Sequence, residues 1–199
     1  MSQVAVPPLA VPVGGVGHRG LGWWGVVCLV ISEGALFGYL LFSYYYYAAQ
    51  LPASWMPRPL PSFGLAGPNT IILLLSSVAA WRGERAARVG RDRAAIGGFA
   101  IAFLLGVVFL VVQGFEWHAK PFSLTSGLYG SLYFTITGFH MAHVLVGVIA
   151  LAAVMLWSRL GYFDANRHVP VLITTIYWHF VDVVWLCVFT TFYITPYLG

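Results

Sequence analysis

Ionisable side chains within long apolar segments are the residues of this sequence best suited to chemistry. Glu33 lies in the first such segment, and later segments add further candidates: Glu116, His140, His143, His179 and Asp182. Carboxyl and imidazole groups can hold or pass a proton, and inside a membrane they commonly mark functional sites. The two histidines of the fourth segment are three residues apart, as are the histidine and aspartate of the fifth, so each pair shares one helix face.

Depth along the segments predicts that several of these groups meet. At about 1.5 Å of rise per helical residue, Glu33 and Asp182 lie at similar depth, and His143 and His179 lie within about a turn of them. We expect a buried polar cluster if the first, fourth and fifth segments pack together. Its predicted members are His140, His143, His179 and Asp182, with Glu33 as a buried functional carboxylate beside them. Glu116 stands apart, near one end of the third segment.

The elements that position these residues must be membrane spans, because the composition leaves too little polar surface for a soluble protein. Of the 199 residues, 60% are hydrophobic and 8% are charged, against roughly a quarter charged in soluble domains. Apolar runs cover residues 21–49, 69–81, 94–117, 128–157 and 169–195. Because a span needs about 20 residues, the second run has to begin nearer residue 65 or extend through residue 86 or 87.

These runs predict the fold class and the domain organisation. We expect an all-α polytopic membrane protein whose residues 21–199 form one bundle of five transmembrane helices. Residues 1–20 are rich in Pro and Gly and are expected to form a flexible N-terminal tail. All eleven prolines are expected outside the cores of the spans or at their ends, since proline disrupts a helix interior.

Small residues inside the runs predict how the helices pack. Gly34 and Gly38 form a small-xxx-small pair, which favours the close approach of another helix beside Glu33. Cys28 and Cys187 also lie within apolar runs, and we expect both thiols to be buried. Two cysteines so far apart indicate neither a disulfide framework nor a zinc site.

The distribution of basic residues predicts the orientation of the bundle. With five spans, eight of the ten basic residues share one side, and only Arg58 and Lys120 lie on the other. Because basic residues concentrate on the cytoplasmic side, we expect the N-terminus inside and the C-terminus outside. The basic residues are thus a topology signal and indicate no nucleic-acid partner. Three of them are also candidates for binding anionic lipid headgroups: Arg82, Arg85 and Arg88.

The polar residues admit more than one role. Glu33 is open to a proton-linked function or to structural pairing, and the cluster residues are open to a purely structural role as hydrogen bonds between helices. No metal site is predicted, since dinuclear sites in bundles use carboxylate–histidine pairs on several facing helices. The histidines also lack the spacing of a b-type cytochrome, and no glycine-rich phosphate loop is present. The residues alone indicate a redox-silent bundle without catalytic residues.

Short motifs extend across most of the chain. They are residues 31–37 (ISEGALF), 69–70 (NT), 116–122 (EWHAKPF), 127–131 (GLYGS), 137–144 (TGFHMAHV) and 177–185 (YWHFVDVVW). In this order they resemble subunit III of haem-copper respiratory oxidases, the cytochrome c oxidase subunit III family. The resemblance covers roughly residues 21–195, and the last motif is the most specific. Two leading helices of the seven-span form have no counterpart here, so the chain resembles the short five-span form of bacteria.

The resemblance implies a non-catalytic subunit of an enzyme that reduces oxygen to water and translocates protons. This chain would carry no cofactor, because haem and copper belong to partner subunits. Subunit I is the expected main contact, with subunit II and a small subunit IV as further partners, cytochrome c as electron donor and phospholipid bound between helices. The expected location is the inner (plasma) membrane of a bacterial cell.

Residue by residue, the resemblance assigns two acids. Glu33 matches the family's buried, carbodiimide-reactive carboxylate, and Glu116 matches an acid at the outer end of its span. The expected role is to stabilise subunit I and to sustain proton uptake during turnover. Ala119 departs from the family pattern, in which a second acid is common at this position.

Other functions remain open on the same residues. A quinol oxidase, or a homologue that accompanies nitric oxide reductase, would use a similar subunit III. Quinol enzymes tend to have Asp where Glu33 stands, which favours cytochrome c as the donor. A proton-coupled transporter is an alternative of a different class. It would be expected to show internal repeats and helices interrupted at mid-membrane, and the sequence indicates neither.

Overall fold

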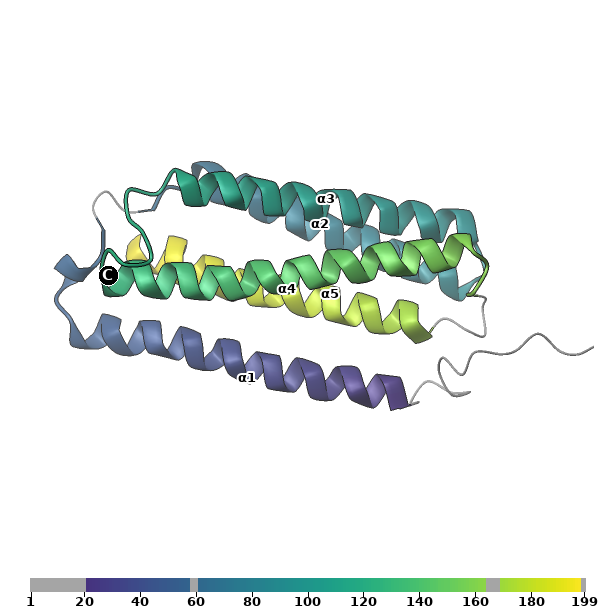
Figure 1. Ribbon diagram of the computed structural model, residues 1–199, viewed down its shortest axis with the longest axis horizontal. Coiled ribbons are helices and arrows are strands. Elements are labelled where there is room, and N and C mark those ends of the chain that lie inside the picture. The colour runs from purple at the N-terminus through teal and green to yellow at the C-terminus, as the bar shows by residue number, and fades with distance from the viewer. Residues whose placement is uncertain (1–20, 58–60, 164–168, 198–199) are drawn as a thin grey trace, which may run out of the picture.

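The structure, a computed structural model, describes residues 21–57, 61–163 and 169–197, which form a bundle of long helices without strands (Figure 1). The helices are α1 (Leu21–Gln50), α2 (Phe63–Arg88), α3 (Asp92–His118), α4 (Leu128–Arg159) and α5 (Val169–Phe189). In this part of the chain five helices are long and apolar enough to cross a membrane. The predicted five-span bundle is therefore confirmed. The predicted tail, residues 1–20, lies outside the described residues.

Short helical turns extend two of these elements. A 3-10 turn, η1 (Ala53–Trp55), follows α1, and α5 continues through a π-helical turn, η2 (Thr190–Ile194), into a second 3-10 turn, η3 (Thr195–Tyr197). A π-helical turn widens the helix and changes the direction of the side chains that follow it. Here it lies in the part of α5 that carries Tyr193, a fully buried residue.

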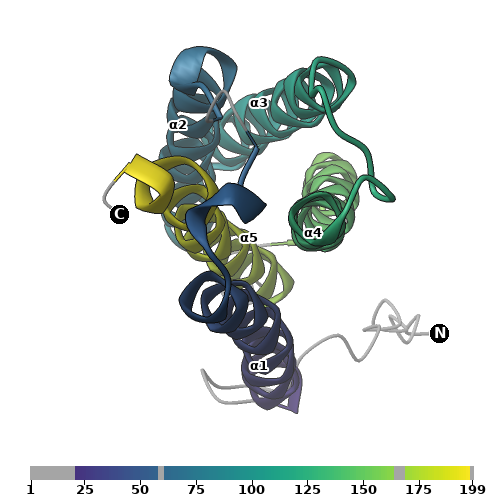
Figure 2. The same ribbon diagram turned by 90° about the vertical axis from the view of Figure 1, so that its left-hand side faces the viewer.

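The helix α5 lies in the middle of the bundle. Seen from one end, it is surrounded by α1, α2 and α4, while α3 packs beside α2 and α4 (Figure 2). In Figure 1, α1 stands apart from the other four and contacts mainly α5. We call the end with Arg82, Arg85, Arg88, Arg91, Arg93 and Arg159 the arginine end. The opposite end, where α1 and α3 finish and Tyr197 lies, is the C-terminal end.

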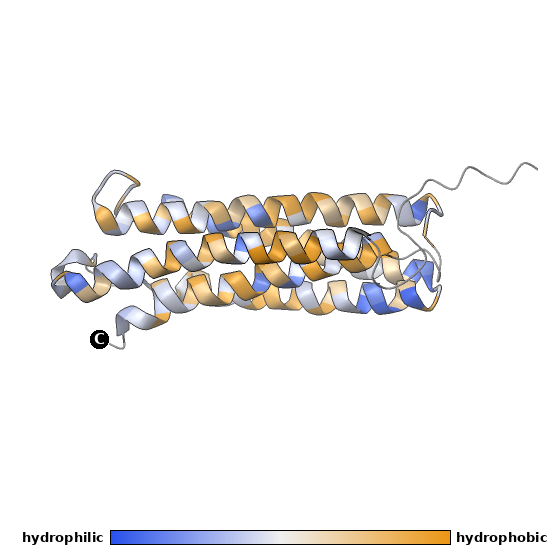
Figure 3. Ribbon diagram, turned by 90° about the horizontal axis from the view of Figure 1, so that it is seen from below, coloured by the Kyte–Doolittle hydropathy of each residue, from blue (hydrophilic) through white to orange (hydrophobic). Residues whose placement is uncertain are grey.

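The bundle is apolar over the middle of its length on the outside as well as the inside. Figure 3 shows hydrophobic residues along every helix and hydrophilic residues gathered near the arginine end. Large side chains such as Ile31, Leu104 and Ile149 are exposed on helix surfaces. In water such a surface would be unfavourable, but a lipid bilayer solvates it. The exposed apolar surface is thus a direct consequence of the membrane setting.

The second helix is longer than its apolar run. It begins at Phe63, five residues before Pro68, so one proline lies inside a helix instead of at a joint. Pro68 precedes the apolar run 69–81, as expected, but the helix begins before that run, so the proline lies in its second turn. Pro68 has no N–H group, so it makes no backbone hydrogen bond to the carbonyl oxygen of Gly64, four residues earlier in the helix. The sequence required either an earlier start, near residue 65, or an extension through residue 86 or 87, and the helix shows both, since it runs from Phe63 to Arg88.

Glycine lets α2 and α3 approach closely. A Cβ atom placed on Gly98 would lie only 2.6 Å from the Cα atom of Gly83, so no side chain fits there. The turn between the two helices is short and includes Gly90 with a φ of 69°, a left-handed conformation that glycine adopts without strain. The close backbone contact of Gly98 with Gly83 and the tight turn at Gly90 explain why α2 and α3 form the most closely packed helix pair.

The close contacts of the bundle lie away from the predicted small-xxx-small pair. A Cβ atom on Gly38 would meet nothing within 4 Å, and one on Gly34 would have only an ordinary contact with Phe180, so the prediction of a tight contact beside Glu33 is wrong. Cys28 and Cys187 are both exposed on the bundle, so the prediction of buried thiols is wrong as well. Apolar runs alone do not distinguish a lipid-facing position from an interior one.

Candidate functional site

Glu33 and His143 form an ion pair or hydrogen bond between α1 and α4. The Oε2 atom of Glu33 lies 3.0 Å from the Nε2 atom of His143. Both residues occupy the middle of their helices, and their side chains are 28% and 16% exposed. The pair is thus partly accessible from the side of the bundle, at a depth where the helices are otherwise apolar.

The second ring nitrogen of His143 holds the ring in place for this contact. Nδ1 lies 2.6 Å from the carbonyl oxygen of Phe139, one turn earlier on α4. Because a carbonyl oxygen only accepts, Nδ1 carries a hydrogen, and Nε2 is the nitrogen that either donates to Glu33 or accepts from it. The Tyr177 hydroxyl donates to the backbone oxygen of His143 at 3.2 Å, and Phe37 packs against the ring.

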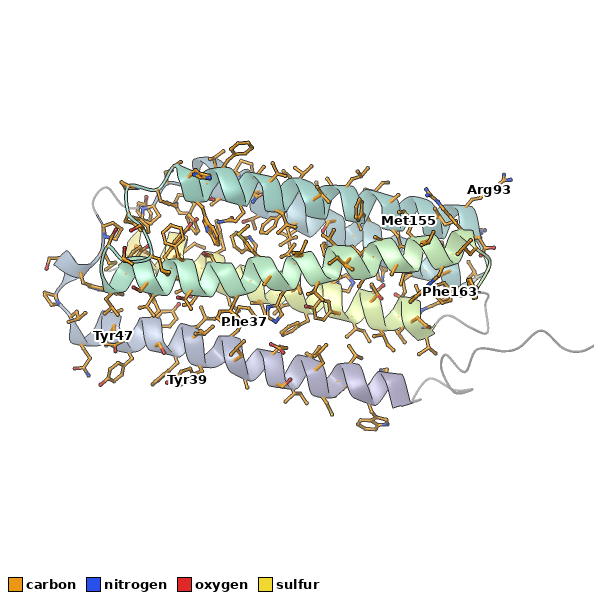
Figure 4. The ribbon with its side chains drawn as sticks, viewed as in Figure 1. Phe37, Tyr39, Tyr47, Arg93, Met155 and Phe163 are labelled. Atoms are coloured by element: carbon orange, nitrogen blue, oxygen red, sulfur yellow. The ribbon has the colours of Figure 1, made fainter. Side chains whose placement is uncertain are left out.

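Side-chain directions on α1 agree with this arrangement. Phe37, one turn after Glu33, points from α1 toward α4, and Tyr39 points away from the bundle (Figure 4). Phe37 is 2% exposed, whereas Tyr39 is 71% exposed. The face of α1 that carries Glu33 and Phe37 is therefore the face that meets the rest of the chain.

His179 and Asp182 do not join the Glu33–His143 pair. The Nδ1 atom of His179 lies 3.0 Å from the hydroxyl of Ser77, on α2. Asp182 is buried one turn further along α5, and its Oδ1 atom has no hydrogen-bond partner among the described residues. The structure thus brings together two of the groups expected to converge and turns His179 toward a different helix.

His140 lies among aromatic rings. It is fully buried, and its ring stacks on Trp185 with centroids 5.0 Å apart. The Phe109 ring stands nearly perpendicular to it, with centroids 5.9 Å apart. Neither ring nitrogen has a hydrogen-bond partner within the described residues. His140 therefore packs as part of the aromatic core and is separate from the contact that His143 makes on the same helix face.

Glu116 belongs to a second polar group, at the C-terminal end of the bundle. Its Oε1 atom accepts hydrogen bonds from the Lys120 ammonium at 2.8 Å and from the Tyr193 hydroxyl. Tyr193 also lies 2.9 Å from the Tyr133 hydroxyl. The Lys120 nitrogen lies 5.2 Å and 5.1 Å from the centres of these two tyrosine rings, which is within range of cation–π attraction.

The three arginines expected at lipid headgroups differ in their surroundings. Arg88 pairs with the carboxylate of Glu84, one turn earlier on α2. The Arg85 guanidinium lies 4.9 Å from the centre of the Trp81 ring, and Arg82 is exposed. All three are near the arginine end, but Arg88 is already engaged with a charged partner of the same chain.

Ser76, Ser77 and Glu84 of α2 were not singled out from the sequence, and Thr70 was noted only as part of a motif. Ser77 meets His179, the Ser76 hydroxyl accepts from Trp178 at 3.0 Å, and the Thr70 hydroxyl accepts from Trp185 at 2.9 Å. Glu84, also overlooked, is 5% exposed. Thr70, Ser77 and Glu84 recur every seven residues along α2, so they share one face of the helix, a signal that was present in the sequence.

Within the described residues, no group of three or more His, Cys, Asp or Glu side chains lies close enough to hold a metal ion. The geometry offers one carboxylate paired with an imidazole, Glu33 with His143, and this pair can hold a proton between two helices. It also offers hydroxyls that fix buried indole and imidazole rings.

Comparison with known proteins identifies the family. The family model of cytochrome c oxidase subunit III matches residues 16–197. The chain is 35% identical to cytochrome c oxidase subunit 3 of Synechocystis sp. over 89% of its own length and 77% of that protein. It is 33% identical to the corresponding protein of Drosophila melanogaster, over 85% of this chain and 68% of the relative. The resemblance inferred from the motifs is confirmed, and this chain belongs to the cytochrome c oxidase subunit III family.

Proposed function

We propose that the chain is the non-catalytic third subunit of a haem-copper respiratory oxidase that takes electrons from cytochrome c in a bacterial inner membrane. The family match over residues 16–197 carries the proposal. Haem and copper belong to partner subunits: subunit I is the main contact, with subunit II and a small subunit IV completing the complex. The N-terminus lies on the cytoplasmic side, because the arginine end carries most of the basic residues.

Within this complex, the subunit stabilises subunit I and sustains proton uptake during turnover. The Glu33–His143 pair supports this role because it places an exchangeable proton at mid-depth, between two helices. A carboxylate that is 28% exposed at this depth is costly against hydrocarbon, so the complex must cover it with polar or protein groups. The pair is thus suited to a position at or near a subunit contact.

A groove between α1 and the helices α4 and α5 supports the proposal of bound phospholipid. Its volume is about 320 Å³, and its walls are almost entirely apolar. It opens beside Val26 and Leu29 of α1, Val146 and Ala150 of α4, and Ile173 of α5. An acyl chain fits such walls, and at the arginine end Arg82 and Arg85 would be available to anionic headgroups.

Purification tests the proposal at the level of the complex. The chain is isolated from native membranes in mild detergent, and the visible spectrum of the co-eluting proteins is recorded. We expect haem a bands together with a larger copper-containing partner, and oxidation of reduced cytochrome c. Turnover with quinol alone would assign the complex to the quinol oxidases. A colourless chain that elutes alone would favour the proton-coupled transporter.

A substitution tests the role of Glu33. Glu33→Gln keeps the size and a hydrogen-bond donor, so we expect normal assembly, loss of carbodiimide labelling and faster inactivation during repeated turnover. Ser32→Ala is the matched control, since the Ser32 hydroxyl bonds only to its own helix at the Leu29 oxygen. Unchanged labelling together with unchanged endurance in Glu33→Gln would contradict the proposed role.

A further inference from the structure

A series of aromatic side chains connects the outside of α1 with a buried carboxylate at the C-terminal end. We call these residues the tyrosine chain, and in order from the surface they are Tyr45, Tyr44, Trp55, Tyr129, Tyr133 and Tyr193. Tyr45 is 42% exposed, whereas the other four tyrosines are buried. The tyrosine chain therefore begins where the protein meets the membrane and ends in the interior of the bundle.

The first half of the tyrosine chain runs through rings in direct contact. The ring centres of Tyr45 and Tyr44, neighbours on α1, are 5.5 Å apart. Trp55 of η1 lies between α1 and α4, with its ring centre 5.4 Å from Tyr44 and 5.7 Å from Tyr129. Electron transfer between aromatic rings slows steeply with distance, so contacts as short as these allow an electron to pass from ring to ring.

The buried end of the tyrosine chain has a proton acceptor. The Tyr129 and Tyr133 rings stack with centres 6.5 Å apart, and the Tyr133 hydroxyl lies 2.9 Å from that of Tyr193. Tyr193 donates a hydrogen bond to Oε1 of Glu116, and the Lys120 ammonium, 2.8 Å from the same oxygen, stabilises the carboxylate form. A phenol that loses an electron becomes a strong acid, so Tyr193 can be oxidised here because Glu116 takes its proton.

The exposed end of the tyrosine chain is Tyr45. It lies in the last turns of α1, at the level where acyl chains meet headgroups, and its hydroxyl lies 3.0 Å from the Thr191 hydroxyl. Tyr46 and Tyr47 are exposed beside it, but their ring contacts among the described residues are with each other and with Phe42. A reactant in the membrane therefore enters the tyrosine chain through Tyr45.

We propose that the tyrosine chain quenches lipid peroxyl radicals and moves the resulting radical to Tyr193. The peroxyl radical takes the phenolic hydrogen atom of Tyr45, which gives a lipid hydroperoxide and a Tyr45 radical. An electron then passes from Tyr193 along the chain to Tyr45, which regains a proton from water at the headgroup level. Tyr193 releases its phenolic proton to Glu116 and becomes a neutral radical beside a neutral acid. The peroxyl radical is the oxidant, and one quenching event needs no other reactant than that proton.

Transfer to Tyr193 ends the radical reaction in the membrane. A radical that stays on an exposed ring can take a hydrogen atom from the next lipid, which renews lipid oxidation. Tyr193 is fully buried, so no acyl chain reaches its oxygen. Trp55 suits the middle of the chain, because an indole can be oxidised without first losing its proton. Its Nε1 atom has no hydrogen-bond partner within the described residues, so no acceptor is at hand for that proton.

Radical trapping in the purified complex tests the proposal. The complex, prepared with ordinary or ring-deuterated tyrosine, is reconstituted in polyunsaturated phosphatidylcholine and exposed to a lipid-soluble azo compound that generates peroxyl radicals on warming. Electron paramagnetic resonance of frozen samples identifies tyrosyl radicals as the signal that narrows with the deuterated label. We expect this signal in the wild type and its loss in Glu116→Gln, because the amide does not take the proton. A wild type without the signal, or an undiminished signal in Glu116→Gln, would overturn the proposal.

A second variant keeps the test decisive if Glu116→Gln perturbs folding. Tyr45→Phe removes the entry point and leaves the Glu116 group untouched, so the tyrosyl signal should be lost and lipid hydroperoxides should accumulate faster. Tyr39→Phe is the matched control, since it removes a phenol from α1 that is 71% exposed and points away from the bundle (Figure 4). Equal effects of the two variants, or a normal signal in Tyr45→Phe, would contradict the tyrosine chain. None of these outcomes depends on haem content or on the electron donor, which test the proposed function.

Discussion

Glu33 of α1 and His143 of α4 contact each other through Oε2 and Nε2, which lie 3.0 Å apart. Nδ1 of His143 donates to the Phe139 oxygen, so the hydrogen between Nε2 and the Glu33 carboxyl group belongs either to a neutral acid or to an imidazolium. In both arrangements the pair as a whole carries no net charge. The pair can therefore remain at mid-depth in the membrane, and proton transfer inside it moves charge over only the 3.0 Å between the two atoms.

The first prediction separates the two members of this pair. Glu33→Gln preserves a donor toward Nε2 and should leave the thermal midpoint of the complex nearly unchanged. His143→Leu leaves the carboxyl group without its partner and should cost roughly 1–3 kcal/mol, the penalty of an unsatisfied polar group. Replacing both polar groups, in Glu33→Leu combined with His143→Leu, should recover part of that loss in a thermal unfolding cycle with the two single leucine variants. Additive effects would contradict a direct contact.

The second prediction concerns the contact between α2 and α3. Gly98→Ala places a methyl group 2.6 Å from the Gly83 backbone, so the helices must separate, and we expect a cost of about 1–3 kcal/mol. Gly97→Ala, the adjacent position, meets nothing within 4 Å and should be neutral or slightly stabilising. Thermal unfolding of the purified complex compares them. Equal midpoints would show that the helices are not in close contact.

The third prediction uses two buried tyrosines. Tyr193→Phe removes the hydroxyl that donates to Glu116 and meets Tyr133, and should destabilise the C-terminal end by roughly 1–3 kcal/mol. The Tyr129 hydroxyl has no hydrogen-bond partner among the described residues, so Tyr129→Phe should cost nothing. Hydrogen exchange of the end of α5 reports the difference. Similar protection in both variants would argue against the Glu116 network.

The fourth prediction concerns the arginine end. Arg88→Met removes the partner of a buried carboxylate, because Glu84 is 5% exposed, and should lower the thermal midpoint. Arg82→Met, an exposed position on the same helix, should have little effect on the midpoint. Both variants remove one positive charge from the arginine end, so any effect on the orientation of the protein in the membrane or on its contact with lipid headgroups should be the same in both. Only the loss of the ion pair should separate them.

The sequence predicts the spans well because the bilayer imposes their length and apolar character. Every apolar run became a helix, and six short motifs, of which residues 177–185 are the most specific, were sufficient to suggest the family. The positions of Cys28 and Gly38 were predicted incorrectly, because a lipid-facing residue and an interior residue are equally apolar. Hydropathy therefore predicts which segments cross the membrane, but it does not predict which face of each helix points into the bundle.

The partners of the polar residues were harder to predict. From their depth in the membrane, His179 and Glu33 were predicted to lie close together. The rotation of each helix about its own axis, however, decides which neighbouring helix a side chain contacts. His179 contacts Ser77 of α2. Serine carries no charge, so its presence in an apolar run does not by itself indicate a buried polar contact. The depth of a residue in the membrane can be estimated from its residue number. The rotation of its helix depends on packing contacts such as those of Trp178 with Gly106 and Gly147.

The central position of α5 has a consequence for biogenesis. The chain is made from its N-terminus, so α1 enters the membrane well before α5, yet α5 is the helix that it mainly contacts. Until α5 is inserted, α1 has few neighbours, and the Glu33 side chain meets the membrane before the bundle is closed. A nascent chain stalled before residue 169 should thus expose α1 to proteases or insertion factors that the finished protein excludes.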